Sequence, residues 1–339
     1  MKKISLLIVS LLAFSHSSVC FSQSTEIAYD FIDNYHENRA RVRWNSKWGF
    51  IDESGKKICK IIFDEVENFE NGLSKVRIHS RGKDIFGFIN KYGNIIIPIK
   101  YDLAGNFSEG LTDVCINSKW GFINNKGKII IPLKYDFVFP FSNGVAKVRI
   151  GELFFCKLGL IDKLGNSITP IIYNEIIDLN NGLFIVNLNN KWGYINKQGK
   201  KVIPIVYDDK FSFSEDLAKV KIDNKFGFID KKGNIVIELK YDYANSFIEE
   251  LASVETNNKY GFINKKGGIS IPIIYDYADN FSQGIACVKL DNKFGWIDKS
   301  GKVVIPIIYE GTWGFSDGIA LVMLNGRLFN IDRNGNEIK

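Results

Sequence analysis

The sequence is poor in the side chains from which catalytic and metal sites are usually built. It has three histidines and two methionines in 339 residues, and the histidines stand far apart at positions 16, 36 and 79. The short motifs of zinc proteases, serine hydrolases, redox dithiols and phosphate-binding loops do not occur in it. We therefore predict no catalytic residues, no metal site and no cofactor, and we expect a protein that is not an enzyme.

Long hydrophobic runs and a large excess of one charge are also missing. No stretch after the first residues approaches the 18 or so apolar residues that suggest a membrane-spanning helix. Lys and Arg number 44 against 38 Asp and Glu, and the two signs are interspersed. We expect neither a membrane-spanning segment nor a nucleic-acid partner, because nucleic-acid binding usually requires clustered positive charge.

The first 22 residues have the composition of a secretory signal peptide. Lys2 and Lys3 precede an apolar run from Ile4 to Phe14, and small or polar residues lead to a suitable cleavage site before Gln23. We expect an exported chain of residues 23–339 that is periplasmic, on the cell surface or extracellular. The alternative is lipoprotein processing at Cys20.

The rest of the chain is one unit repeated about nine times. Each anchor is an aromatic residue and a glycine, followed by a second aromatic residue and isoleucine, and successive anchor glycines are 34 or 38 residues apart. Gly159 belongs to an aliphatic copy, and Phe329 replaces the glycine in a decayed copy. The aromatic anchors are Trp48-Gly49, Phe86-Gly87, Trp120-Gly121, Trp192-Gly193, Phe226-Gly227, Tyr260-Gly261 and Phe294-Gly295. Residues 23–339 therefore form a single array that starts and ends within a repeat.

This anchor resembles the WG-repeat family (WG-containing β repeat) of exported bacterial proteins. Glycine is kept in eight of the nine copies, and the resemblance covers nearly all of the chain after residue 22. The family has no shared catalytic residues, so the resemblance implies a repeat architecture and no particular chemistry.

The pattern within one unit predicts three short antiparallel strands. Residues 217–222 and 225–229 alternate between apolar and polar side chains, residues 234–237 are rich in β-branched side chains, and turn residues separate the three segments. Three strands cannot bury their aromatic face alone, so neighbouring units must stack. We predict an all-β array of about nine 34-residue units, open or superhelical, with a closed propeller-like ring as the alternative.

Two copies contain insertions of four residues before the next anchor. They lie between Val76 and Gly87 and between Val148 and Gly159. Four residues can lengthen each arm of a hairpin by two, which keeps every side chain on its face. We expect longer hairpins at both places. Phe154 and Phe155 would lie near one tip and form a candidate binding surface.

Three recurring features have a structural and a functional interpretation. The anchor aromatics could stack on a ligand, but we expect them to be core, with the glycine permitting close backbone approach. The Asp or Asn three residues after the glycine could bind calcium, but we expect a turn cap, because Asn serves equally well there. Tyr-Asp pairs, such as Tyr241-Asp242, are expected to anchor loops.

The four cysteines after the signal segment have no matched partners in the repeat. Cys59, Cys115, Cys156 and Cys287 occupy different repeat positions. We expect four free thiols that act as small hydrophobic side chains.

Repetition of identical units favours binding over catalysis. We expect a non-enzymatic exported scaffold that binds another macromolecule, with a protein of the cell envelope or the exterior as its partner. The alternatives are a cell-envelope glycan-binding module and an architectural spacer.

Overall fold

The computed structural model describes residues 28–152 and 155–338. Within these residues every regular element is a β-strand, and no helix is long and apolar enough to cross a membrane. The chain divides into two compact units, residues 1–78 with 89–94 and residues 79–88 with 95–339. The signal-like segment 1–22, which contains Cys20, and Phe154 lie outside the described residues.

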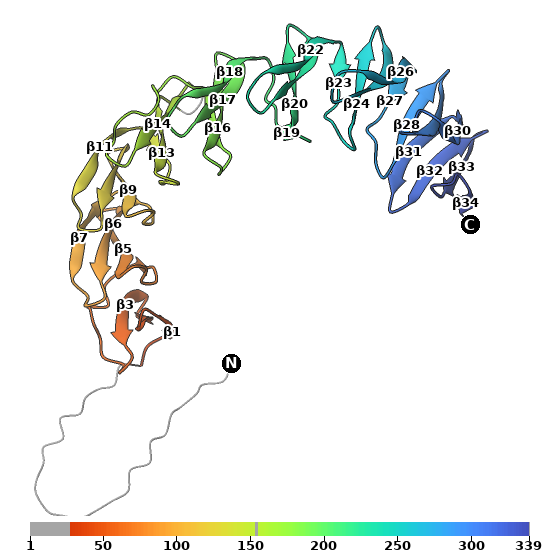
Figure 1. Cartoon of the computed structure of the whole chain (residues 1–339). Helices are drawn as coiled ribbons and strands as arrows, with labels where there is room; N and C mark the ends of the chain where they lie inside the picture. The colour runs from red at the N-terminus through yellow and green to blue at the C-terminus, as the bar shows by residue number, and fades with distance from the viewer. Residues whose placement is uncertain (1–27, 153–154, 339) are drawn as a thin grey trace, which may run out of the picture. The chain divides into compact units, whose positions relative to one another are not determined.

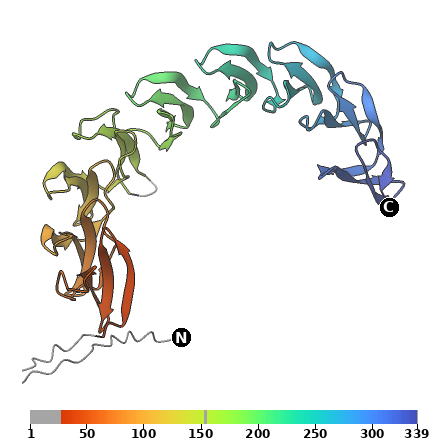
Figure 2. The same cartoon turned by 60° about the horizontal axis from the view of Figure 1, so that its bottom comes forward.

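The strands form nine small antiparallel sheets, each made of strands that are consecutive in sequence (Figures 1 and 2). The first four are β1 (Phe31–His36), β2 (Arg39–Trp44) and β3 (Lys47–Asp52); β4 (Glu65–Val66), β5 (Leu73–Ser80), β6 (Lys83–Asn90) and β7 (Ile95–Tyr101); β8 (Leu103–Ala104), β9 (Leu111–Ile116), β10 (Lys119–Asn124) and β11 (Ile129–Tyr135); and β12 (Phe137–Val138), β13 (Val145–Ile150) and β14 (Lys157–Asp162).

The other five sheets all have four strands. They are β15 (Glu175–Asp178), β16 (Leu183–Leu188), β17 (Lys191–Asn196) and β18 (Lys201–Tyr207); β19 (Phe213–Ser214), β20 (Leu217–Ile222), β21 (Lys225–Asp230) and β22 (Ile235–Tyr241); β23 (Tyr243–Ala244), β24 (Leu251–Thr256), β25 (Lys259–Asn264) and β26 (Ile269–Tyr275); β27 (Tyr277–Ala278), β28 (Ile285–Leu290), β29 (Lys293–Asp298) and β30 (Val303–Tyr309); and β31 (Gly311–Ser316), β32 (Ile319–Leu324), β33 (Arg327–Ile331) and β34 (Glu337–Ile338).

The predicted all-β repeat architecture is confirmed, and each four-stranded sheet adds one strand to the predicted three. In the sheet β23–β26 the added strand is β23, which pairs with β24 through only two residues. Each such sheet takes its first two strands from one sequence repeat and its last two from the next. Neighbouring sequence repeats are therefore joined by strand pairing within a sheet, as well as by packing between sheets. The open form of the array stays a prediction.

The hydrophobic core consists of separate layers between successive sheets. In one layer, Leu251, Phe262 and Tyr275 of the sheet β23–β26 pack against Val288 and Ile297 of the sheet β27–β30. Each sheet thus covers the aromatic face of the one before it. This is the stacking that a unit too small to bury its own face requires.

The anchor glycine is required because the next strand of the same sheet passes over it. A Cβ atom at Gly261 would lie 2.7 Å from the backbone of Ile271 and Ile273. The ladder between β25 and β26 is irregular on both sides of Phe262, which brings the β26 backbone into this space. At all eight anchor glycines the nearest atom would be 2.4–2.9 Å from an added Cβ. The expected close backbone approach is confirmed.

The recurring Asp or Asn caps the turn that follows each anchor strand. Its side-chain oxygen accepts the backbone N–H groups two and four residues later, as Asp230 does from Lys232 and Asn234 and as Asn264 does from Lys266 and Gly268. Asp and Asn make the same hydrogen bonds, so the turn-capping interpretation is confirmed. No group of three or more His, Cys, Asp and Glu that could hold a metal lies in the described ranges.

The aspartate of each Tyr-Asp pair ties one sheet to the next. Asp242 Oδ1 pairs with Lys225 Nζ at 2.5 Å, and its Oδ2 accepts the N–H of Asn257 at 2.9 Å. Lys225 lies on β21, whereas Asn257 lies in the hairpin turn of the next sheet. The Lys–Asp pair recurs as Lys83–Asp102, Lys119–Asp136, Lys191–Asp208 and Lys259–Asp276. The expected loop-anchoring role is confirmed.

The two insertions differ in structure. The first lengthens both arms of the hairpin as predicted, because β5 and β6 have eight residues where the corresponding strands of most repeats have six. The prediction for the second is wrong, because β13 and β14 keep six residues each. Gly151 leaves the strand with a φ of 98° and donates its N–H to Asp136 Oδ2. This capped turn ends the pairing at Ile150, so the hairpin is not lengthened.

The cysteines occupy separate positions in the sheets. Cys115 is buried on β9, Cys59 and Cys287 are half-buried, and Cys156 lies in the loop before β14. Burial raises the pKa of the Cys59 thiol to about 11 and that of the Cys287 thiol to about 12. These two thiols are therefore protonated and weakly nucleophilic at neutral pH.

The glycine contact gives a paired stability prediction. Gly227→Ala should lower the free energy of unfolding by about 1–3 kcal/mol or more, because the new Cβ would lie 2.6 Å from Ile237 O. Gly311→Ala is the control, since its Cβ would meet only Met323 at 3.8 Å. Urea unfolding followed by circular dichroism measures both changes. Equal effects of the two substitutions would contradict the close-approach argument.

Candidate functional site

The two aromatic residues of each anchor have different environments. The second is core: Phe228, Phe262 and Trp296 are buried. The first is half-buried in all seven aromatic anchors, as at Trp192, Phe226 and Tyr260, and only the aliphatic Leu158 is buried there. The first aromatics thus pack against the core clusters without being fully buried, as Phe226 and Tyr260 do. The next sheet covers the second aromatic fully and the first one only in part.

The half-buried aromatics lie in rows that run across the strands of each sheet. In the sheet β23–β26, Tyr243 pairs with Glu255, which pairs in turn with Tyr260. In the sheet β27–β30 the corresponding row is Tyr277, Lys289 and Phe294. Side chains directly opposite one another on adjacent antiparallel strands are close enough to touch. The rows thus place two aromatic rings on either side of one polar side chain.

Aromatic rings also meet between successive sheets. The ring centroids of Phe226 and Tyr243 are 5.6 Å apart, and those of Tyr260 and Tyr277 are 6.0 Å apart. Such distances and tilted orientations are favourable for ring pairs. We call Phe226, Tyr243, Tyr260, Tyr277 and Phe294 the aromatic ladder.

Basic side chains lie over the ladder rings. Lys219 Nζ is 5.6 Å from the ring centroid of Phe226 and 5.3 Å from that of Tyr243, and Lys289 Nζ is 5.3 Å from that of Phe294. These are cation–π distances. Burial lowers the pKa of Lys219, opposed by the charge of Asp209.

Two tyrosine hydroxyls of the ladder, those of Tyr260 and Tyr277, have raised pKa values. Burial, followed by the hydrogen bond and charge of Glu255 and the neighbouring tyrosines, raises the pKa of Tyr260 to about 12. The pKa of Tyr277 is also raised, chiefly by burial and then by Asp279. Both hydroxyls can therefore donate and accept hydrogen bonds at neutral pH.

The ladder ends at a pocket of about 490 Å³ between the last two sheets. Tyr277, Lys289 and Phe294 line it from the sheet β27–β30, and Thr312 and Trp313 line it from β31. Trp313 is 69% exposed, which is unusual for so large an apolar side chain.

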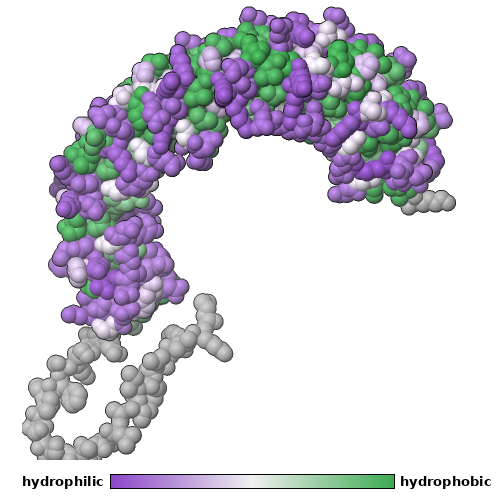
Figure 3. All heavy atoms as spheres, viewed as in Figure 1, coloured by the Kyte–Doolittle hydropathy of each residue, from purple (hydrophilic) through white to green (hydrophobic). Residues whose placement is uncertain are grey.

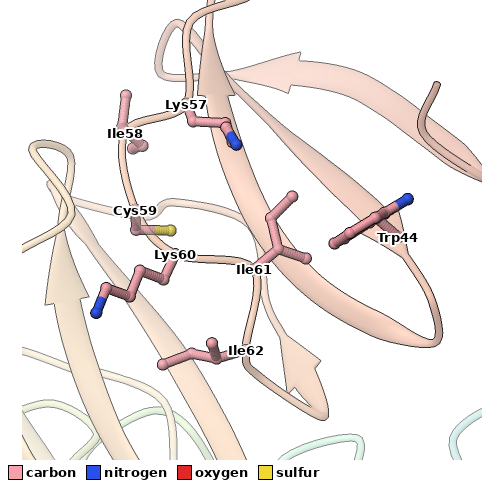
Figure 4. A pocket seen from close by; sticks show the side chains of 7 residues that line it. All are labelled: Trp44, Lys57, Ile58, Cys59, Lys60, Ile61 and Ile62. Carbon is pink, nitrogen blue, oxygen red and sulfur yellow. The ribbon is translucent and has the colours of Figure 1, made fainter. Parts of the chain in front are cut away.

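A second depression lies at the outer edge of the first sheet. It has a volume of about 480 Å³ and is lined by Trp44 and residues 57–62. Ile61 points toward Trp44, whereas Lys60 points away from it (Figure 4). Residues 57–62 form no strand. This site has one aromatic side chain and lacks the paired rings of the ladder.

Exposed apolar side chains follow a different set of strands. Ile95, Ile129, Ile235, Ile269 and Val303 begin the edge strands β7, β11, β22, β26 and β30, and each is 46–62% exposed. We call these five residues the apolar edge row. Hydrophobic patches recur along the margin on which β11, β18 and β22 are labelled in Figure 1 (Figure 3). Pro132, Pro272 and Pro306 lie on these edge strands, where a residue without an N–H to donate is tolerated.

The sequence-derived candidate at the second insertion is not part of either set. Phe155 is 86% exposed, and its N–H donates to the carbonyl oxygen of Glu152 at 3.0 Å. The repeat pattern does not single out the ladder residues Tyr243 and Tyr277, because this position varies between repeats. They follow the aspartate of a Tyr-Asp pair, a position at which the repeats also contain Leu103 and Glu175.

The chain belongs to the family of proteins with the WG-containing repeat. The family model matches nine segments: residues 25–48, 48–81, 86–120, 120–154, 159–192, 192–226, 226–260, 260–294 and 294–327. The resemblance drawn from the anchors is thereby confirmed. Among curated proteins, none matches this sequence.

Solved structures similar to this chain are β-propeller proteins. A eukaryotic initiation factor matches with a TM-score of 0.34 and 11% identity, over 93% of this chain and 89% of the other. Hsv2 of Kluyveromyces lactis matches with a TM-score of 0.30 and 8% identity, over 66% of this chain and 90% of the other. Similarity at this level supports no argument about function.

The different burial of the two anchor aromatics gives a second prediction. Tyr194→Ala should lower the free energy of unfolding by about 3–5 kcal/mol, because Tyr194 is buried and donates a 2.6 Å hydrogen bond to Phe211 O. Trp192→Ala, in the same strand, should cost about 1–2 kcal/mol, because its side chain is half-buried. Chemical unfolding of the two variants compares them directly. A larger loss of unfolding free energy for Trp192→Ala than for Tyr194→Ala would show that the Trp192 side chain contributes more to the core.

The aspartates that join the sheets predict acid sensitivity. Hydrogen bonds from lysine lower the pKa values of Asp102, Asp136, Asp242 and Asp276, followed in each case by smaller effects. A lowered folded-state pKa contributes stability above the unfolded value of about 3.9, and this stability is lost as the pH falls through the folded value. The Tm should therefore be nearly constant from about pH 7 to 5 and should fall below about pH 4.

A variant with Asn at these four positions is the matched control. Asn174 occupies the same position naturally and accepts the N–H of Asn189 at 3.0 Å, so Asn fits there. Thermal unfolding of this variant should show a smaller loss of Tm between pH 5 and 3 than the unmodified chain. Identical pH profiles would contradict the assignment.

Proposed function

We propose that this chain is an exported, non-enzymatic scaffold whose surface binds another macromolecule, with a protein as the partner. The observation that carries this proposal is the apolar edge row. Side chains of Ile and Val are exposed at the same position in five sheets, and repeated apolar exposure on a folded surface is typical of protein interfaces. The signal-like composition of residues 1–22 supports export.

The surroundings of the row favour a partner that is both apolar and acidic. Lys100, Lys134 and Lys240 are exposed on β7, β11 and β22, the same strands that carry Ile95, Ile129 and Ile235. An apolar centre with a charged rim is the usual arrangement of a protein interface. The prolines on several of these strands remove one N–H each, so contact through side chains is favoured over pairing with an added strand.

A test replaces four of the five side chains of the row without disturbing their strands. The combined variant Ile129→Thr, Ile235→Thr, Ile269→Thr and Val303→Thr keeps β-branched side chains, so the sheets should remain folded. Leu103→Thr is the control, because Leu103 is 48% exposed on β8, at the edge of its sheet opposite β11. A partner is first isolated from envelope fractions and purified. Its affinity for each variant is then measured by calorimetry.

The combined variant should bind the purified partner at least tenfold more weakly, and Leu103→Thr should bind it unchanged. Equal affinity of the combined variant would overturn the proposed interface. Circular dichroism and the Tm establish that both variants are folded.

The second candidate function is glycan binding in the cell envelope, and the half-buried aromatic side chains favour it. Aromatic rings with one apolar face available and polar groups beside them can hold sugar rings. Sedimentation with purified peptidoglycan separates this function from protein binding, because the protein partner is absent from that assay.

A further inference from the structure

The aromatic ladder is continuous over three successive sheets of the second unit. Phe226 lies on β21, Tyr243 and Tyr260 on the sheet β23–β26, and Tyr277 and Phe294 on the sheet β27–β30. Ring contacts join Phe226 to Tyr243 and Tyr260 to Tyr277, and cross-strand rows join the remaining neighbours. Because packed sheets lie about 10 Å apart, the ladder extends over the length of several sugar rings.

The ladder is distinct from the core beside it. Tyr243 is 38% exposed and Tyr277 is 42% exposed, whereas Phe228, Phe262 and Trp296 are buried on the same sheets. The following sheet covers Phe228, Phe262 and Trp296 completely, whereas it leaves the exposed tyrosines of the aromatic ladder accessible. The exposed tyrosines are therefore available to a ligand without unpacking the core.

Charges along the ladder are mixed. Glu255 lies between Tyr243 and Tyr260 in one row, and Lys289 lies between Tyr277 and Phe294 in the next. Lys219 lies over the rings of Phe226 and Tyr243. A strongly anionic polymer would meet Glu255, and a cationic one would meet the two lysines. Electrostatic complementarity therefore favours an uncharged ligand with hydroxyl groups.

The pocket at the end of the ladder adds an enclosed site. Tyr277 and Phe294 belong to both the ladder and the pocket, and Trp313 faces the same space from the next sheet. The lining also contains two carboxylates, one ammonium group and one hydroxyl, from Asp276, Asp279, Lys289 and Thr312. Apolar walls with a few polar groups are typical of small-ligand sites, and this pairing suits a sugar ring.

We propose that the aromatic ladder is a binding track for an extended neutral polysaccharide, and that the pocket beside Trp313 holds one end of the bound segment. Sugar rings stack on Tyr243, Tyr260 and Tyr277, and their hydroxyl groups bond to Glu255, Asp279 and Lys289. This inference rests on the glycan-binding candidate function and names its site and ligand class. It does not depend on the apolar edge row.

The experiment measures binding of the purified exported chain to defined oligosaccharides by calorimetry. The probes are hexamers of β-1,4-glucose, β-1,4-N-acetylglucosamine and α-1,4-glucose, with polygalacturonate as the anionic comparison. Saturable binding to at least one neutral hexamer is expected, together with weaker binding of polygalacturonate. Trp313 fluorescence, taken as the difference between the unmodified chain and Trp313→Ala, should change on binding.

The variants locate the site. Tyr243→Ala with Tyr277→Ala should weaken binding about tenfold or more, as loss of central aromatic contacts commonly does. Tyr243→Phe with Tyr277→Phe should keep most of the affinity, because the stacking surface remains. Leu103→Ala is the matched control: Leu103 pairs with Cys115 as Tyr243 pairs with Glu255, but it lies outside the ladder. Circular dichroism and the Tm show whether each variant is folded.

The proposal would be overturned by no saturable binding of any neutral hexamer, by equal binding of the folded double-alanine variant, or by preferential binding of polygalacturonate. The combined variant of the apolar edge row distinguishes failure of the glycan proposal from failure of the protein-binding proposal. It should keep full hexamer affinity while losing the protein partner. If it loses both, the two surfaces are not independent and the separate track is contradicted.

Discussion

The close approach of the edge strand to the anchor glycine is the contact on which the rest of each sheet depends. At Gly261 the β26 backbone occupies the space of the missing Cβ, and β26 can lie there because its pairing with β25 is irregular on both sides of Phe262. The same path brings Ile271 and Tyr275 into the buried layer. It also ends at Asp276, which pairs with Lys259. One absent methyl group thus sets the position of the edge strand, part of the core and the link between sheets.

The same geometry explains why one aromatic of each anchor remains accessible. The residues before and after the glycine are two positions apart on one strand, so both point to the same face of the sheet. The following sheet covers that face, and its β-branched residues, such as Val288 and Ile297, lie over Phe262. Tyr260 packs only against the margin of this layer. The following sheet thus does not reach the hairpin tip, near which Tyr260 lies. A surface with aromatic rings therefore results from the way the sheets stack.

Much of this architecture could be predicted from the sequence, because it depends on local signals that recur. Turn caps at Asp230 and Asn264, the glycine contact and the Lys225–Asp242 link each follow from residue types at fixed spacing. The fourth strand could not be predicted, since it consists of only two residues, Tyr243 and Ala244. Two residues show no alternation of apolar and polar side chains. Half-burial of Tyr260 could not be predicted either, because it depends on how far the next sheet extends. The unlengthened hairpin at the second insertion could not be predicted, because it depends on one hydrogen bond, from Gly151 to Asp136.

The two proposed surfaces use positions that can change without loss of the fold. The sheet β15–β18 has Glu175 where the ladder has Tyr243, and Lys201 where the edge row has Ile235. Its core is nevertheless intact, since Val186 and Ile195 are buried as in the other sheets. Core positions are constrained by packing, whereas these surface positions are constrained only by what they contact. Tyr243 and Tyr277 keep 38% and 42% of their surface exposed, and Ile269 and Val303 on the edges of the same two sheets keep 62% and 46%. The proposed glycan track therefore shares these two sheets with part of the apolar edge row, whose other members lie on β7, β11 and β22.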